Sequence, residues 1–124
     1  MKTDRELLEL AAKAAGIPGS VYSFPGMLER YGFNEAIYDD AGDSHWNPLT
    51  DDGDALRLAI KLSLRVECYT GVKIIPKYGE CNVTDVYSVR DEKIALSESH
   101  NGDPYAATRR AIVRAAAAIG EQMK

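Results

Sequence analysis

The sequence has only two cysteines, no long apolar run and no motif of a common catalytic class. Cys68 and Cys81 lie in predicted strands, without a CxxC pair or a His-Cys cluster. We therefore expect two reduced, mostly buried thiols and neither a zinc site nor a disulfide. No segment reaches the length of a membrane span, and the N-terminus lacks the apolar stretch of a signal peptide. These absences predict a cytoplasmic protein that spans no membrane.

Signatures of catalysis are also missing. The chain has no Walker loop, no GxGxxG after a predicted strand and no HExxH. Its only histidines, His45 and His100, fall in separate predicted loops, and neither adjoins a serine or cysteine in a nucleophile motif. Both are expected to be surface or loop residues. The sequence therefore favours a protein that acts by binding, with no catalytic residues and no cofactor.

Positive charge is scarcer than negative charge, and the formal net charge is −4. Proteins that coat duplex nucleic acid neutralise its phosphates with a basic surface, so this class is not expected. Hydrophobic residues make up 45% and charged residues 27% of the 124 residues. This length and composition are typical of one globular domain. We predict a single domain over 1–124, with an N-terminal segment, 1–45, and a core segment, 46–124.

The N-terminal segment begins with a short helix. Thr3 and Glu6 have the spacing of a capping box, and the apolar pattern that follows predicts a helix to about Ala15. Gly16 then supplies a left-handed stop.

A stretch rich in glycine, proline and aromatic residues occupies 18–49. A merely solvated loop would not carry so many rings, so we expect a loop that packs against the core. Within it the sequence predicts a helical turn at 28–31 and a short edge strand at 36–38. The acidic 39–43 turn resembles part of a calcium loop but lacks its ligand spacing and distal glutamate, so no calcium site is expected.

The core segment reads as helix, strands and helix. The first helix is predicted at 51–64, capped by Thr50 or Asp52, and the last at 103–123, with Asp103 as N-cap and Pro104 at the first helical position. Short breaks separate four predicted antiparallel strands, with a bulge allowed near 84–85: 66–70, 72–76, 83–89 and 93–97. The predicted fold is therefore α+β, with an antiparallel β-meander layered with helices.

Both core helices are amphipathic. In the helix at 51–64 one broad apolar face is predicted to cover the sheet, comprising Ala55, Leu56, Ala59, Ile60, Leu62 and Ser63. In the last helix an alanine-rich seam allows a close approach, either to the sheet or to a second copy of the chain. We expect a homo-oligomer.

Two motifs carry a resemblance. The turn Trp46-Asn47-Pro48-Leu49 with the run from Asp51 to Leu56, and the run from Arg109 to Ala116, resemble the phage ABA-sandwich family of small phage and prophage proteins. The match spans residues 46–116. It implies an α/β/α sandwich of helix, sheet and helix layers, and it implies no reaction and no catalytic residues.

Candidate ligand contacts combine rings with guanidinium groups, because rings can stack a base and arginines can meet phosphate. The residues are Trp46, Tyr105, Arg109, Arg110 and Arg114, with further rings at Tyr22, Phe24, Tyr31 and Tyr38. Ordinary packing and a solvated helix face are the alternative interpretation. Arg109 lies at the margin of the packing face, where a guanidinium needs a partner. That partner is either a first-turn acid, Asp51, Asp52 or Asp54, or a ligand.

The leading hypothesis is a non-enzymatic phage or prophage accessory protein that acts by binding, and that sequesters a nucleotide-type host signalling ligand. One alternative is a metal-dependent phosphoester hydrolase in which Asp51, Asp52 and Asp54 hold a divalent cation. Acids at a helix start are also common because they favour the helix dipole. The other alternative is a structural or host-protein-binding phage protein.

Overall fold

The computed structural model describes residues 2–39, 44–73, 77 and 79–123. The elements in chain order are α1 (Asp4–Ala15), α2 (Met27–Tyr31), β1 (Ile37–Asp39), β2 (Ser44–Trp46), α3 (Asp52–Lys61), β3 (Leu64–Val72), β4 (Cys81–Ser88), β5 (Ala95–Ser99) and α4 (Pro104–Gln122). They form a single-domain α+β structure in which an antiparallel meander packs against helices, as predicted. None of the described helices is both long enough and apolar enough to cross a bilayer.

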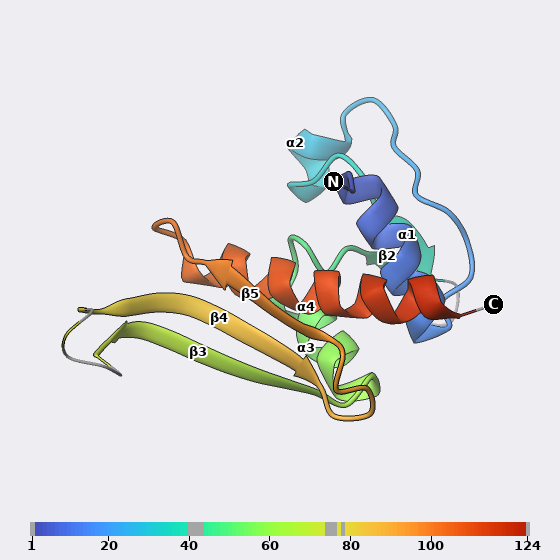
Figure 1. The fold of residues 1–124 in the computed structure, drawn as a ribbon. Coiled ribbons are helices and arrows are strands. Elements are labelled where there is room, and N and C mark those ends of the chain that lie inside the picture. Colours follow the sequence, from blue (N-terminus) through green and yellow to red (C-terminus); the bar gives the residue numbers. More distant parts are fainter. Residues whose placement is uncertain (1, 40–43, 74–76, 78, 124) are drawn as a thin grey trace.

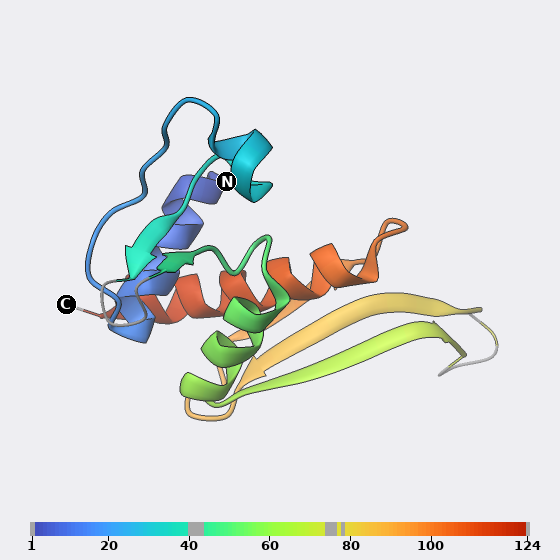
Figure 2. The same ribbon diagram turned by 180° about the vertical axis from the view of Figure 1, so that it is seen from behind.

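The helices gather on one face of the sheet β3-β4-β5. Figures 1 and 2 show α4 lying along the sheet, α3 beside it, and α1 stacked on the far side of α4. The order of layers therefore differs from the expected helix, sheet and helix. Along β4 the buried side chains Thr84, Val86 and Ser88 share one face, whereas Asp85 and Tyr87 lie on the other, half-exposed face. Because this outer face is largely polar, no second helical layer is needed to cover it.

Among the described residues the sheet has three strands, where four were predicted. The break expected at Thr70-Gly71 is wrong, since β3 continues through both residues to Val72. Pairing with β4 shifts register between Thr70 and Val72, and Gly71 has a φ of +66°. A glycine that accepts this conformation lets the strand absorb one extra residue as a bulge, instead of turning back. The predicted strand residues 74–76 lie outside the described residues.

The bulge expected near 84–85 is also wrong, because β4 pairs in continuous register with β5 across this region. Val86 is the apolar residue that faces the helices, while Val83 and Tyr87 belong to the half-exposed outer face. Side chains along β4 therefore alternate regularly between the two faces of the sheet, and each face carries some apolar residues.

The aromatic N-terminal segment packs only partly as expected: Val21, Ile37 and Trp46 are buried in the core, whereas Phe24, Tyr31 and Tyr38 stay exposed. The predicted strand at 36–38 is observed as β1, and it pairs with β2, which the sequence had not indicated. His45 in β2 lies among the rings of Tyr22, Tyr31 and Phe33, with the Tyr31 centroid 4.4 Å from that of His45. The hydroxyl of Tyr22 hydrogen-bonds His45 Nδ1. A histidine expected in a loop thus sits in a strand within an aromatic cluster.

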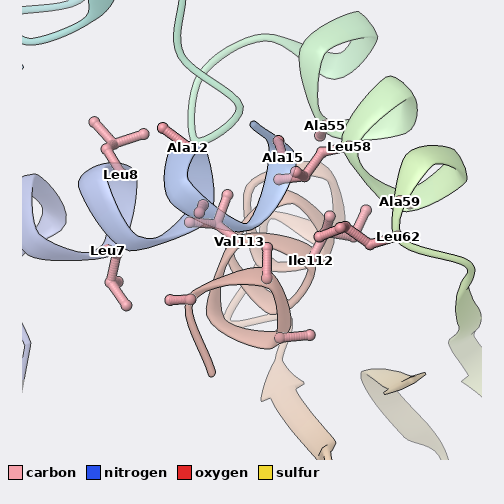
Figure 3. Close-up of a cluster of buried hydrophobic side chains, with 14 of the residues drawn as sticks. Leu7, Leu8, Ala12, Ala15, Ala55, Leu58, Ala59, Leu62, Ile112 and Val113 are labelled. Carbon is pink, nitrogen blue, oxygen red and sulfur yellow. The ribbon is translucent and has the colours of Figure 1, made fainter. Parts of the chain in front are cut away.

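The core lies between α1, α3 and α4 (Figure 3), where labelled side chains from all three helices point toward one another. On α4 the alanine-rich seam is buried within the chain, with Ala111, Ala115 and Ala116 fully inaccessible. Close to its end, Gly120 lies against the backbone of Leu10 in α1. The sequence left open whether this seam packs on the sheet or on a second copy of the chain. Its burial within one chain rules out the second copy.

Candidate functional site

A groove with a volume of about 430 Å³ lies between α3, β3 and α4. Cavities of this size hold small organic ligands. Its lining is mostly apolar. The lining residues are Ala55, Leu56 and Ala59 of α3, Val66, Cys68 and Thr70 of β3, and Tyr105, Thr108, Arg109 and Ile112 of α4, with Asp52 and Pro104 at the helix starts. The groove therefore joins an apolar body to charged groups near the starts of α3 and α4.

Arg109 supplies the positive charge of the groove. Its Nε donates to the backbone carbonyl of Leu49 at 2.9 Å, and its Nη1 donates to Asp52 Oδ1 at 2.7 Å. The Arg109 side chain is only 18% exposed, whereas that of Asp52 is 74% exposed. The predicted ion pair between Arg109 and a first-turn acid is thus confirmed, with Asp52 as the partner.

The rim of the groove exposes large apolar side chains. Tyr105, one turn before Arg109 on the same face of α4, is 70% exposed, and Leu56 of α3 is 60% exposed. The sequence had placed Leu56 and Ile60 on the face of α3 that covers the sheet, but Leu58 is buried in their place and Ile60 is 70% exposed. The helix turns its Ala55, Leu58 and Ala59 side inward, so two large side chains face water.

A chain of hydrogen bonds runs from the groove into the protein. Thr108 and Cys68 both line the groove, with their Oγ1 and Sγ atoms 3.7 Å apart. The Thr108 hydroxyl lies 2.7 Å from the hydroxyl of buried Thr84, which in turn lies 3.0 Å from His100 Nε2.

His100 is in a loop, as expected, but it is buried, and its Nδ1 atom has no hydrogen-bond partner among the described residues. Cys68 is a free thiol, yet the expectation that it is mostly buried is wrong. It lies on the outermost strand, beside a groove that no helix fills. The hydrogen-bonded residues Cys68, Thr84, His100 and Thr108 come together only because β4 pairs with its neighbouring strands. Their spacing in the sequence therefore gave no sign of this network.

The other predicted ligand contacts lie elsewhere. Arg110 pairs with Asp4 at 3.0 Å, and Arg114 pairs with Glu98 of β5. Both arginines line a second hollow on another side of α4. Trp46 is buried in the core. Of the five candidates, only Arg109 and Tyr105 share the groove.

The three acids at the start of α3 have separate roles. Asp51, and not the expected Thr50 or Asp52, is the N-cap, because its carboxylate accepts from the backbone N–H of Asp54 at 2.8 Å. The Asp54 carboxylate accepts from the backbone N–H of Asn47 at 3.0 Å and pairs with Arg57 at 2.8 Å. Within the described residues no group of three or more histidine, cysteine or acidic side chains is placed to hold a metal ion.

No family model, curated protein or solved structure matches this chain. The resemblance to phage proteins therefore stays a prediction. Chemically the groove offers apolar walls, one oriented guanidinium and one exposed thiol. No general base lies beside a nucleophile in it, since His100 contacts the hydroxyl of Thr84 and is separated from Cys68 by that side chain.

Proposed function

We propose that this chain is a binding protein whose groove takes a small ligand with a flat apolar body and one anionic group. The observation that carries the proposal is Arg109, a guanidinium held by the Leu49 carbonyl in the lining of a mostly apolar groove. Guanidinium groups bind carboxylate and phosphate oxygens in the same geometry. The resemblance to small phage proteins supports binding over catalysis, with the host cytoplasm as the place of action.

Arg109 can bind a ligand anion if that anion replaces the carboxylate of Asp52. Asp52, on the first turn of α3, holds Arg109 through an ion pair whose acid side is 74% exposed. Such an exposed carboxylate gains little from the pair and can rotate into water at small cost. Arg109 itself stays in place, because the carbonyl of Leu49 holds its Nε. A ligand anion can therefore replace Asp52 without moving the guanidinium.

A nucleoside monophosphate has the chemistry that the groove accepts. Its base can stack on the exposed ring of Tyr105 while its phosphate meets Arg109, four residues further along the same helix face. Arg110 and Arg114 are engaged in ion pairs on another side of α4. This supports a ligand with one anionic group over a polyphosphate. Sequestration of a signalling nucleotide is the role that we propose for it.

Isothermal titration of adenosine and adenosine monophosphate tests the proposal. We expect the monophosphate to bind more tightly, because charge-assisted hydrogen bonds contribute about 1.5–3 kcal/mol, or about tenfold to a hundredfold in Kd. Arg109→Ala should remove this advantage. Asp52→Asn should strengthen binding of the monophosphate, because it removes the competing carboxylate.

Arg110→Ala is the matched control, because it deletes an ion-paired arginine next to Arg109 that faces the other hollow. It should leave the affinity unchanged. The proposal is wrong if neither compound binds, if both bind equally, or if Asp52→Asn weakens binding as Arg109→Ala does. The hydrolase alternative gains no specific observation, because Asp52 pairs with Arg109, whereas Asp51 and Asp54 share Arg57.

A further inference from the structure

The strand β3 forms an open edge of the sheet. It is the outer strand of the order β3-β4-β5, and Figures 1 and 2 show no helix or strand of the described chain beyond it. The opposite edge, β5, has five residues, and its Ser97 carbonyl accepts from Arg114 at 3.5 Å. β3 has nine residues. A long open edge presents a row of backbone donors and acceptors for another strand.

We propose that two copies of this chain pair through their β3 edges, antiparallel about a two-fold axis at Val66, to form one six-stranded sheet. Closed two-fold dimers are the commonest assembly of soluble proteins, and their interface must be complementary to itself. The interface shares Leu56, Val66 and Cys68 with the lining of the groove, but the inference rests on strand pairing and not on the proposed ligand. It specifies both the partner, a second copy, and the register.

Charge favours this register over its immediate neighbours. With the axis at Val66, Arg65 of each copy lies directly opposite Glu67 of the other, so two opposite-charge pairs form across the interface. A shift of the axis by one residue in either direction places Glu67 opposite Glu67, or Arg65 opposite Arg65, and like charges directly opposite are unfavourable. Within one chain Arg65 and Glu67 lie 2.8 Å apart on the outer face, so the pairs across the interface extend this ion pair into a network of four alternating charges.

The shape of β3 supports the same register. An axis at Cys68 avoids like charges, but it extends the pairing to Gly71, where the strand is bulged and φ is +66°. An axis at Val66 uses only Leu64–Cys68, whose pairing with β4 is regular. On the inner face it places Val66 opposite Val66 and Leu64 opposite Cys68, which are apolar contacts.

Exposed apolar side chains flank this edge. Leu56 and Ile60 of α3 are 60% and 70% exposed, and α3 leads directly into β3 on the helical side of the sheet. Strand pairing alone buries less surface than a stable interface needs, so an adjoining apolar contribution is required. These two side chains supply it.

Native mass spectrometry and light scattering of the full chain, over a concentration series, test the pairing. The wild type should be a dimer. Arg65→Glu and Glu67→Arg should each be monomeric, because each places like charges opposite one another. The double variant Arg65→Glu/Glu67→Arg should dimerise again, since the swapped charges are complementary. Lys93→Glu makes the same charge change at another exposed site and should stay dimeric.

Circular dichroism confirms that each variant is folded, and hydrogen exchange of the wild type gives a second test without substitution. The outward amides of Leu64–Cys68 should be protected at dimer-forming concentrations and exchange faster on dilution. A monomeric wild type, single variants that stay dimeric, or a folded double variant that stays monomeric would each overturn the proposal.

Discussion

Replacing Gly120 with alanine should separate the two helices that form most of the core. A Cβ at Gly120 would lie 2.1 Å from the carbonyl oxygen of Leu10 and 2.9 Å from its carbonyl carbon. Both are backbone atoms of α1 and cannot rotate away. The only relief is a movement of α1 away from α4.

The magnitude follows from two opposing effects. A movement of about 1 Å forfeits a quarter to a half of the dispersion energy of the contacts that it opens, and overpacking of a core costs about 1–3 kcal/mol. The upper end applies here, because Leu7, Leu8, Ala11, Ala12 and Ala15 of α1 are all buried. Alanine in place of glycine favours the helix itself by about 1 kcal/mol. The net loss of unfolding free energy is therefore about 2 kcal/mol.

Thermal unfolding followed by circular dichroism measures this loss. For a domain of this size about 2 kcal/mol lowers the Tm by about 6–10 °C. Gly53→Ala is the matched control, because Gly53 also lies in a helix but its added Cβ would meet only movable side chains, with the nearest atom, on Arg57, at 3.1 Å. One of these side chains is the N-cap Asp51, whose Oδ2 would lie 3.2 Å from the new Cβ, so Gly53→Ala should change the Tm much less than Gly120→Ala does. An equal or higher Tm for Gly120→Ala would refute the close helix crossing.

Two further outcomes are expected. Thr84→Val should cost about 1–3 kcal/mol in urea unfolding, because it leaves the buried His100 and the Thr108 hydroxyl without a shared partner. The hydrogen bond to Glu67 raises the pKa of Tyr69 from 10.0 to about 12. The folded protein thus holds this proton more tightly than the unfolded chain, so its stabilising effect is complete below pH 10 and is lost as pH rises through 12. In an ultraviolet titration, Glu67→Gln should shift Tyr69 ionisation downward.

Local rules predicted the elements whose signals are local. The capping box at Thr3 and Glu6 is present, and Asp103 caps α4 with Pro104 at its first position. These features depend on residues three or four apart, which the sequence displays directly. The turn expected at Gly71 failed because one glycine serves a turn or a bulge equally well. Only the partner strand decides between them.

The buried face of α3 was harder to predict, because the helix has more apolar residues than its buried face holds. Ala55, Leu58 and Ala59 contact the rest of the chain, so Leu56 and Ile60 remain exposed. A helix with apolar residues on two sides can pack through either, and periodicity alone does not choose. The exposed pair is informative for that reason, since it marks the side of the domain where the groove and the open strand lie.

The helical period explains why the five candidate ligand residues separate. Tyr105 and Arg109 are four residues apart and share one face of α4, and Thr108 and Ile112 complete the groove wall at the same spacing. Arg110 is one residue on, about 100° around the helix, with Arg114 on its side. Adjacent arginines on a helix therefore serve different surfaces. Grouping residues by chemical type overlooks this rotation, whereas grouping them by face leaves Arg109 and Tyr105 as the pair that a single ligand can reach.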